Sequence, residues 1–510
     1  MRLRILLACL VLLGLFIGIV SAFNRLPSLI GRTESKALPA SLDTQIGRAI
    51  GPRIAARPGL SGIHQLTEAR DAFAARMLLA ERAERSLDVQ YYIWRHDISG
   101  DLLFKALGRA ADRGVRVRLL LDDHSTAGLD SILADLDSHP NIEVRLFNPL
   151  AIRRPRFLAY LTDFSRLNRR MHNKSLTADS QVTIIGGRNI GDEYFGITQD
   201  VAFVDLDVMA IGPVVDEVSK DFDRYWASES AYPVETLLPR GMFADFASHV
   251  GPIARDALAA AYLEAIRESS FVRRMLGGEL KLDWAMTRMV SDDPAKVLGR
   301  SEPQSNMFPK LKEILGEPAA ELQLVSPYFV PTAAGVEWFS AMSRRGVKIE
   351  VLTNSLDATD VAAVHAGYAK HRKPLLSAGI ALYEAQRRSG IDSSSGLSGS
   401  SDTSLHAKTF AVDNLRVFVG SFNFDPRSAH LNTELGFVID SPAMAREIAG
   451  AFEHAIPALA YEVRLSPARD LYWLESRGER VVRIDVEPGT SFLQRAGVKV
   501  LSILPIEQLL

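Results

Sequence analysis

The amino-acid sequence predicts an α/β protein in which two similar lobes follow an N-terminal membrane segment. Two observations predict the lobes: the order of expected strands and helices occurs twice, and both copies lead to the same His-Lys sequence. A nearly unbroken apolar run at the N-terminus predicts the membrane segment. The chain has 510 residues, which is more than one compact core usually accommodates and agrees with two lobes.

The N-terminal segment begins with Arg2 and Arg4, and an almost uninterrupted apolar run follows from Ile5 to Phe23. A run of about 20 apolar residues is long enough for one helix across ~30 Å of hydrocarbon. The sequence Val20-Ser21-Ala22 also matches the small residues of a signal cleavage site. A retained anchor and a cleaved signal therefore both remain open.

The expected secondary structure has the same order in two parts of the chain. In each part a strand, an amphipathic helix and a buried strand form a βαβ unit, and a further strand follows. Gly114 and Gly346 are 232 residues apart, and such a long period indicates duplication of a whole lobe rather than a solenoid. The expected elements are strands 86–94, 114–122 and 142–147 with helix 101–113 in the first copy, and strands 321–329, 346–352 and 380–383 with a helix ending at Arg344-Arg345 in the second.

Composition sets the expected limits of the segments. Residues 24–60 are rich in Arg, Pro and Gly without periodicity and are predicted to be a linker, whereas residues 228–300 look largely helical. A Ser/Gly-rich stretch, Ser389–Ser404, precedes the second His-Lys sequence, and both a lid over the site and a surface excursion remain open. The expected limits are 1–23 for the membrane segment, 24–60 for the linker, 61–227 for the first lobe, 228–300 for a helical connection, 301–460 for the second lobe and 461–510 for a C-terminal extension.

The residues that carry chemistry form one motif in two copies. In both copies the histidine is followed by Lys, Asp, Gly and Asn at offsets of 2, 7, 14 and 17 residues. Residues two apart on a strand project from the same face, so the His and Lys of each copy can act on one ligand. The sequence around the second pair is typical of a strand. The motif residues are His172, Lys174, Asp179, Gly186 and Asn189 in the first copy and His406, Lys408, Asp413, Gly420 and Asn423 in the second.

This pattern resembles the signature of the phospholipase D superfamily, in which HxKxxxxD and a following Gly-Gly/Ser-x-Asn turn occur twice. The resemblance implies two phospholipase D-like α/β lobes related by a pseudo-twofold axis, with the motifs facing each other. Further stretches are similar to bacterial cardiolipin synthases, particularly those of the class C type, and the similarity covers nearly all of the chain after residue 60. These stretches are 186–195, 203–207, 326–331, 420–428 and 504–510.

The resemblance also implies the reaction. Cardiolipin synthases of this family transfer a phosphatidyl group onto the free hydroxyl of phosphatidylglycerol, and the donor is a second phosphatidylglycerol or phosphatidylethanolamine. The expected partners are therefore anionic phospholipids and the membrane. One departure concerns the N-terminus, because many synthases of other classes have two membrane spans there and this sequence has one apolar segment.

The chemistry explains the two histidines. Cleavage of a phosphodiester through a covalent intermediate needs a neutral imidazole that attacks phosphorus and a protonated imidazole that donates to the leaving oxygen. By analogy with the family, His172 is the nucleophile that becomes a phosphohistidine, and His406 is the acid and later the base. The scheme requires no metal or other cofactor.

The remaining motif residues have supporting roles in the same analogy. Lys174 and Lys408, with the amides of Asn189 and Asn423, are expected to hold the phosphate oxygens in the transition state. Asp179 and Asp413 complete the candidate catalytic set but are expected to fix the turn behind the site rather than touch substrate. Each histidine also needs a carboxylate that orients it. Glu434 and Asp205 are the candidates for this role.

Charge and motif integrity bear on other functions. The sequence contains 59 Lys+Arg and 61 Asp+Glu, a formal net charge of -2, which provides no basic field for a nucleic acid and disfavours a nuclease. A hydrolytic phospholipase D would use the same residues with water as acceptor, so it remains the main alternative. A non-catalytic lipid-binding scaffold predicts decay of at least one motif, and neither copy shows decay. The single cysteine, Cys9, excludes an intramolecular disulfide.

Two further features indicate contact with a membrane. Residues 153–170 interleave arginines with Phe157, Tyr160 and Phe164, a combination suited to anionic head groups, although a solvated helix face is the alternative. The apolar residues between Phe492 and Leu504 are a second candidate contact or an internal packed helix. Arg2 and Arg4 favour a cytoplasmic N-terminus. The expected location is the bacterial inner membrane, with the lobes on the periplasmic side.

Overall fold

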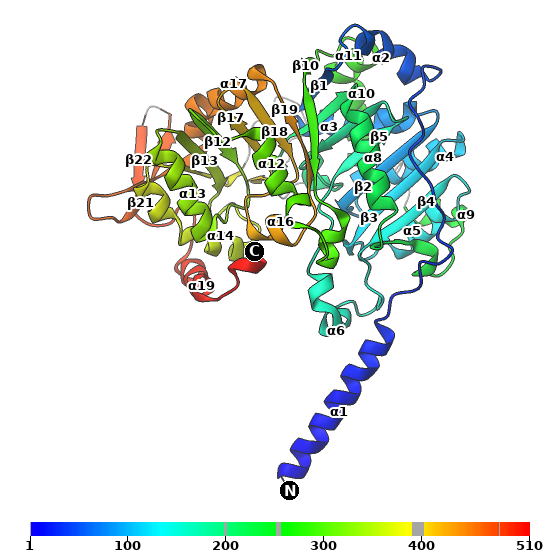
Figure 1. Ribbon diagram of the computed structural model, residues 1–510, viewed down its shortest axis with the longest axis horizontal. Coiled ribbons are helices and arrows are strands. Elements are labelled where there is room, and N and C mark those ends of the chain that lie inside the picture. Colours follow the sequence, from blue (N-terminus) through cyan, green and yellow to red (C-terminus); the bar gives the residue numbers. More distant parts are fainter. Residues whose placement is uncertain (1, 198–200, 251–256, 390–401, 479) are drawn as a thin grey trace.

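In the computed structural model the chain forms two lobes, each built on a mixed β-sheet with helices on its faces (Figure 1). The predicted α/β fold with two similar lobes and an N-terminal apolar helix is confirmed. Of the Ser/Gly-rich stretch, residues 390–401 lie outside the described part of the chain, so the lid stays untested. The described residues are 2–197, 201–250, 257–389, 402–478 and 480–510.

The first sheet combines parallel and antiparallel strands. The strands formed by residues 86–93, 116–125 and 142–147 run parallel to one another, and the others are antiparallel to their neighbours. In spatial order the strands are β10 (Asp283–Ala285), β1 (Ser61–Leu66), β8 (Asp207–Ile211), β6 (Val182–Gly186), β5 (Ser175–Ala178), β2 (Ser86–Ile93), β3 (Arg116–Ser125), β4 (Ile142–Phe147) and β9 (Ala231–Pro233).

The second sheet repeats this arrangement and adds strands at one edge. Its parallel strands are formed by residues 321–325, 348–354 and 381–385. In spatial order the strands are β11 (Thr287–Ser291), β19 (Leu435–Ile439), β18 (Arg416–Gly420), β17 (Thr409–Val412), β12 (Glu321–Val325), β13 (Lys348–Asn354), β14 (Ala381–Ala385), β20 (Ala460–Leu465), β21 (Leu471–Arg477) and β22 (Arg480–Ile484).

The two sheets share one topology in their centres. The order β8-β6-β5-β2-β3-β4 in the first lobe corresponds strand for strand to β19-β18-β17-β12-β13-β14 in the second. In both lobes the motif lies where the antiparallel hairpin joins the parallel strands, since β5 pairs with β2 and β17 pairs with β12. The duplication therefore extends from the motif to the whole central sheet.

Helices cover both faces of the first sheet. Along β3, Leu119 and Leu121 pack with the core under α3, α4 and α5, whereas Leu120 packs with aromatic residues of α8, because successive strand residues point to opposite faces. The helix α4 begins after Asp97, whose carboxylate accepts the Gly100 N–H at 2.9 Å. The helices of this lobe are α2 (Gln45–Ala55), α3 (Ala69–Arg82), α4 (Ile98–Asp112), α5 (Asp130–Asp137), α6 (Phe157–Leu167), α7 (Asp192–Phe195), α8 (Val214–Trp226), α9 (Phe243–His249), α10 (Ala257–Arg267) and α11 (Ser270–Leu276).

The second lobe has its own core and receives the C-terminal residues. Phe329, Phe339 and Tyr368 meet in this core with apolar residues of the central strands. The C-terminal elements pack on this lobe, since α19 contacts α14 and the final turn contacts α16. The helices are α12 (Met307–Leu315), α13 (Thr332–Arg344), α14 (Ala362–Ala369), α15 (Arg372–Ser377), α16 (Pro426–His430), α17 (Pro442–Gly450), α18 (Ile456–Leu459), α19 (Phe492–Ile503) and the 3-10 turn η6 (Glu507–Leu509).

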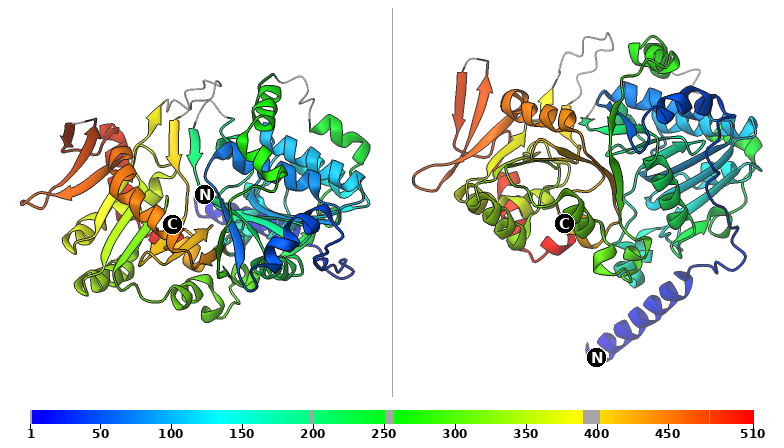
Figure 2. Two further views of the ribbon diagram at one scale, coloured as in Figure 1. Left: turned by 90° about the horizontal axis from the view of Figure 1, so that it is seen from above. Right: turned by 45° about the horizontal axis from the view of Figure 1, so that its top comes forward.

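Two features join the lobes, which lie side by side in Figure 2. A shared core combines Val208 of β8 with Val417 and Phe437 of the second lobe, all fully buried. A small separate sheet also crosses the boundary. In it, β16 (Asp402–Leu405) of the second lobe runs parallel to β7 (Val201–Val204) of the first and antiparallel to β15 (Arg388–Ser389).

The segment 24–60 differs from the expected linker. It lies along the first lobe and contains α2. Arg32 donates to the carbonyl oxygens of Ser228, at 2.6 Å, and Ala231, at 2.9 Å. The polar groups of this irregular segment thus form hydrogen bonds with the surface of the first lobe.

The connection and the C-terminal boundary also differ from expectation. Residues 228–300 contain α9, α10 and α11, but they also contain β9, β10 and β11, so a largely helical connection is wrong for their ends. Strand β10 pairs with β1 of the first lobe, and β11 pairs with β19 of the second. Residue 461 is not a boundary either, because β20 pairs with β14 and continues the second sheet. Such short strands are fixed by pairing with distant segments, which local periodicity does not reveal.

The N-terminal helix α1 (Arg2–Phe23) projects from the lobes beside α6 (Figure 1). It has 22 residues with a mean hydropathy of 2.9, and its side chains are largely exposed. By length and composition it is able to cross a membrane. The side chain of Asn24, directly after the helix, donates to the Ala159 carbonyl oxygen at 2.8 Å. This contact ties the base of α1 to α6.

The motif aspartates sit in the two hairpin turns behind the site. Asp179 and Ser180 have φ of 52° and 54°, and Asp413 and Asn414 have the same two values. Two successive residues with positive φ are what a type I′ hairpin turn requires, and Asp and Asn tolerate this region. Each carboxylate then accepts backbone N–H groups at the start of the neighbouring parallel strand. The Asp179 donors are Glu84, Arg85 and Ser86, and the Asp413 donors are Ala319, Ala320 and Glu321.

We predict that Asp179→Ala lowers the free energy of unfolding by about 1–3 kcal/mol, because it leaves the buried N–H of Ser86 and the part-buried N–H groups of Glu84 and Arg85 without an acceptor. Asp413→Ala is the matched control and should cost less, since the N–H groups of Ala319 and Ala320 are exposed. Chemical denaturation of the detergent-solubilised full chain, followed by tryptophan fluorescence, measures both. Equal losses in the two variants would contradict this account of the turns.

Candidate active site

The two motif histidines stand in short extended segments rather than inside continuous strands. His172 lies between a bridge formed by Met171 and the start of β5, and His406 lies between the end of β16 and the start of β17. The expected uninterrupted strand is therefore wrong at the motif. Here the backbone pairs with the opposite lobe: the His172 N–H donates to the Thr433 carbonyl oxygen and the His406 N–H to that of Val204, both at 2.8 Å.

The residue after each of these carbonyl groups supplies a carboxylate to the same histidine. Glu434 Oε2 of the second lobe lies 2.8 Å from His172 Nδ1 of the first. Asp205 Oδ2 of the first lobe lies 2.5 Å from His406 Nδ1 of the second. The two sequence-predicted carboxylates thus occupy orienting positions, and each acts across the lobe boundary. With Nδ1 held in this way, Nε2 is the nitrogen left for substrate.

Different groups hold the two carboxylates. Glu434 accepts hydrogen bonds from the hydroxyls of Ser421 and Ser428. Gly187 occupies the place in the first motif that Ser421 has in the second, and a Cβ there would lie 2.2 Å from Asp205 Oδ1. Glycine at this position is therefore required by the close approach of Asp205. The Gly/Ser difference between the motif copies follows from their carboxylates.

The electrostatic surroundings of the two histidines also differ. Burial, together with the charges of Lys174 and Lys408, holds the pKa of His172 well below its ordinary value, and burial raises the pKa of Glu434 to about 7. At His406, burial and Lys408 lower the pKa, but Asp205 opposes them. Although burial alone would raise the pKa of Asp205, its contact with His406 brings it below the ordinary value. The carboxylate beside His406 is thus the more fully ionised of the two.

The motif lysines lie behind the histidines. Lys174 Nζ donates to the His172 carbonyl oxygen at 2.6 Å, and Lys408 Nζ lies 3.0 Å from His406 Nδ1. Burial lowers the pKa of Lys174 to about 7 and that of Lys408 to about 8. A phosphate between the histidines would favour the charged form of both lysines, because a nearby opposite charge offsets the cost of burial.

A cavity of about 370 Å³ opens in front of the histidines, and Asn189 and Asn423 lie on its wall. The Asn189 amide nitrogen donates to the Tyr194 hydroxyl at 2.9 Å. The second N–H of this amide remains able to donate to a ligand. Asp179 and Asp413 are absent from the described residues that line this cavity. Of the candidate set, the two histidines and the two asparagines line the cavity, and the lysines and aspartates lie outside its described lining. Lining residues beyond the motif are Tyr92, Ile93, Tyr194, Tyr328, Asp360, Val361, Val364, Asp425, Arg427, Ser428, Asn432, Leu509 and Leu510.

Sequence reasoning missed most of these wall residues. Tyr92 lies near the end of β2, whereas Tyr328 lies three residues beyond the end of β12, so the lobe repeat does not align the two tyrosines. Burial raises the pKa of Tyr92 to about 12, which keeps its hydroxyl protonated and able to donate. Arg427 binds the Asn168 carbonyl oxygen of the first lobe at 3.0 Å and the Leu509 carbonyl oxygen of the C-terminal turn. No local pattern in the sequence indicates that the C-terminal residues reach the site.

Comparisons with known proteins agree with this geometry. The family model described as cardiolipin synthase, PLD-like domain, matches residues 78–226 and 311–456, one segment in each lobe. Cardiolipin synthase C of Escherichia coli (strain K12) is 50% identical over 471 residues, which cover 91% of this chain and 100% of the relative. An uncharacterized protein of Helicobacter pylori (strain ATCC 700392 / 26695) is 32% identical and covers 84% of this chain and 86% of its own length.

A solved structure has the same fold. Phosphatidylserine synthase from Haemophilus influenzae Rd KW20 matches with a TM-score of 0.56 at 13% identity, over 91% of this chain and 100% of the solved one. At this identity the likeness concerns the fold alone. The matched family segments, the 50% identical relative and the paired motifs lead to one assignment. The chain belongs to the cardiolipin synthase family of phospholipase D-like proteins.

Proposed function

We propose that this protein is a phosphatidyltransferase that forms cardiolipin from phosphatidylglycerol and a phosphatidyl donor. The observation that carries the proposal is that the histidines and asparagines of two intact motifs meet at one cavity, in a chain half identical to a cardiolipin synthase C. The donor is phosphatidylglycerol or phosphatidylethanolamine. The anionic lipids of the membrane are the substrates.

The first half-reaction uses the two histidines in opposite protonation states. His172 Nε2 attacks the phosphorus of the donor, and a P–N bond forms while the P–O bond to the head-group alcohol breaks. His406 gives its proton to the departing oxygen. The products are a phosphatidyl-histidine at His172, a released alcohol and a neutral His406.

The second half-reaction reverses these roles at His406. Its neutral imidazole takes the proton of the hydroxyl on phosphatidylglycerol, and the resulting oxygen attacks phosphorus as the P–N bond breaks. Cardiolipin leaves, His172 returns to its neutral form and His406 is again protonated. Atoms and protons therefore balance over one cycle without a metal or other cofactor.

The electrostatic difference between the two sites supports this assignment of roles. The depressed pKa of His172 favours the neutral ring that a nucleophile needs. The pKa of His406 is lowered overall as well, but the ionised Asp205 beside it opposes the lowering and so favours the imidazolium that a general acid needs. Lys174 and Lys408 stabilise the negative charge that develops on the phosphorane oxygens. Transfer to a lipid hydroxyl, rather than to water, is supported by the apolar wall that Val361, Val364 and Leu510 give the cavity.

Three apolar features on one side of the molecule support attachment to a membrane. In Figure 1, α1, α6 and α19 lie on the side where the C-terminal turn reaches the site. On α6 the side chains of Phe157, Leu161 and Phe164 are exposed, and on α19 Phe492 and Ile503 are exposed. We infer that α1 anchors the protein in the inner membrane, with these helices at the lipid interface and the lobes on the periplasmic side.

We predict that purified protein incubated with labelled phosphatidylglycerol, with and without phosphatidylethanolamine, produces labelled cardiolipin. His172→Ala and His406→Ala should each lower turnover by on the order of 10³-fold or more, because neither histidine can replace the other. Activity should persist in EDTA. Chromatographic separation of the lipid products is the measurement, and exclusive release of phosphatidic acid would instead identify a hydrolase.

A second prediction tests the separate roles of the histidines through pH dependence. Asp205→Asn removes the charge that raises the pKa of His406, so the acid loses its proton at lower pH. The alkaline limb of the activity profile should therefore move to lower pH by about 1–3 units. Glu434→Gln is the control: it should lower the rate through misorientation of His172 without moving this limb downward.

The same roles predict where the covalent intermediate forms. After a short reaction with labelled donor, the label should be base-stable, acid-labile and located on His172 by peptide mapping. Label on His406 would reverse the assignment, and an unchanged alkaline limb in Asp205→Asn would remove its electrostatic basis.

The membrane arrangement predicts that deletion of residues 1–23 releases the protein from membranes after a salt wash, while both lobes still fold. In the deleted form, Phe157→Ser with Leu161→Ser should weaken binding to anionic vesicles further. The matched control is Leu415→Ser with Val481→Ser, two exposed apolar side chains on other elements, and it should have no effect in vesicle sedimentation.

The side of the membrane is tested by reporter fusions behind residue 60. A reporter that works only after export should be active at this junction, whereas a cytoplasmic reporter should be inactive. The opposite pattern would place the lobes in the cytoplasm.

A further inference from the structure

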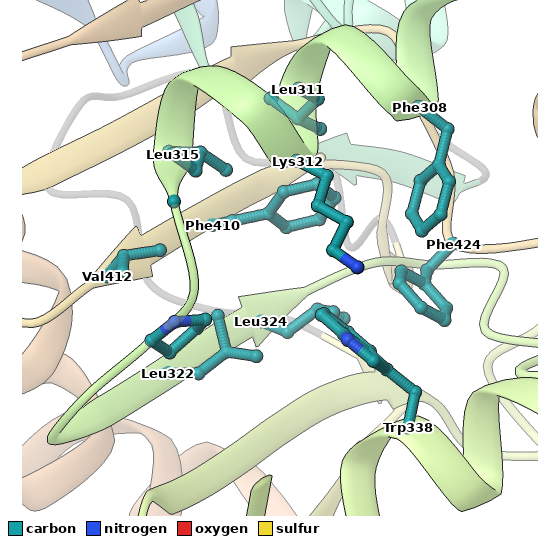
Figure 3. A pocket seen from close by; sticks show the side chains of 12 residues that line it. Phe308, Leu311, Lys312, Leu315, Leu322, Leu324, Trp338, Phe410, Val412 and Phe424 are labelled. Carbon is teal, nitrogen blue, oxygen red and sulfur yellow. The ribbon is translucent and has the colours of Figure 1, made fainter. Parts of the chain in front are cut away.

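The second lobe has an apolar groove next to the catalytic cavity, and the family match and the motif chemistry leave this groove unexplained. Its wider part has a volume of about 460 Å³ and continues into a narrow end of about 50 Å³. Phe308, Lys312, Trp338 and Phe424 line both parts, so the two form one groove. Figure 3 shows the narrow end, where these side chains converge with apolar residues of β12 and β17.

The groove and the catalytic cavity are lined by neighbouring residues of the same chain segments. Asn423 lines the cavity, Phe424 lines the groove, and Asp425 lines both. At the C-terminal turn, Gln508 lines the groove while Leu509 lines the cavity. The groove and the cavity therefore lie on the two sides of one chain segment, and Asp425 borders both.

The lining determines what kind of ligand fits. Phe424 stacks with Trp338 at a ring-centroid distance of 6.2 Å and meets Phe308 edge-on at the same distance. These rings leave a channel that favours an apolar and elongated ligand. Lys312 is exposed and lines both parts of the groove, and Figure 3 shows its side chain extending between Phe410 and Phe424.

We propose that this groove binds an acyl chain of the phospholipid whose phosphodiester lies between His172 and His406. The inference rests on the proposed function and deepens it, because it assigns the lipid tail a site on the second lobe. Each methylene group buried in the groove strengthens binding roughly fourfold. The groove therefore determines the preference for lipids with longer acyl chains, whereas the histidines determine the rate of the chemical step.

The test fills the groove without touching the catalytic residues. Ala334 of α13 lines the groove and is exposed, and Ala333 precedes it on the same helix, is equally exposed and does not line it. Turnover is measured with dihexanoyl- and dioctanoyl-phosphatidylglycerol below their micellar concentrations, and with bis(4-nitrophenyl) phosphate, a diester without acyl chains. In the unchanged protein, kcat/KM should rise at least tenfold from the dihexanoyl to the dioctanoyl lipid.

Ala334→Trp should lower kcat/KM for dioctanoyl-phosphatidylglycerol about tenfold or more and leave hydrolysis of the nitrophenyl diester unchanged. Ala333→Trp should change neither. Trp338→Ala removes part of the groove wall without adding bulk, and it should also reduce the preference for the longer lipid. Because the two substitutions change the groove in opposite ways, the test does not depend on the folding of one variant. Retention of the full preference in both groove variants would overturn the proposal.

These outcomes separate the groove from the proposed transferase activity. If the unchanged protein releases phosphatidic acid and forms no cardiolipin, the proposed transfer fails, but a chain-length preference that Ala334→Trp abolishes still supports the groove. If cardiolipin forms and its rate is independent of Ala334→Trp, the transfer stands and the groove proposal fails.

Discussion

Each motif histidine is held by a carboxylate and a carbonyl group from the opposite lobe, and this reciprocal contact is the constraint on which the site depends. Glu434 orients His172, and Asp205 orients His406. In both cases the residue before the carboxylate accepts the N–H of the histidine. Neither lobe can therefore build a complete site alone. A small displacement of one lobe would disturb both histidines together, since the exchange runs in both directions across the boundary.

The remainder of the interface keeps this exchange in register. The buried core shared by β8, β18 and β19 fixes the two sheets against each other. The pairing of β16 with β7 carries His406 directly to Val204 and Asp205. On the other side of the site, Arg427 reaches from the second lobe to Asn168 of the first. Because packed interfaces resist deformation, the distances between histidine and carboxylate are set by many contacts rather than by one hydrogen bond.

Symmetry of the backbone is combined with asymmetry of the side chains. The strand order of the two sheets is the same, but Gly187 makes room for Asp205 where Ser421 donates to Glu434. The two histidines consequently differ in electrostatic surroundings although they occupy equivalent places. The second lobe alone extends its sheet through β21 and β22 and contributes the C-terminal turn to the cavity wall. The pseudo-twofold frame thus supplies two equivalent histidines, and local substitutions make them unequal.

The sequence by itself determined the repeat, the two motifs and the membrane helix. Equal spacing of His, Lys, Asp, Gly and Asn is a local property, and so is the apolar run of α1. Even the Asp179 and Asp413 turns follow from local φ preferences. The carboxylates Glu434 and Asp205 were found from short sequence patterns, but nothing local indicated that each serves the other lobe.

Only the tertiary structure decided which groups surround the histidines. His172 and Glu434 are 262 residues apart in the chain, and His406 and Asp205 are 201 apart. The same holds for the short strands β10, β11 and β20, for the turn at Leu509 and for the apolar groove, all of which depend on contacts between distant segments. Periodicity and spacing report on neighbours along the chain, whereas pKa values, cavity walls and lobe contacts are fixed by neighbours in space.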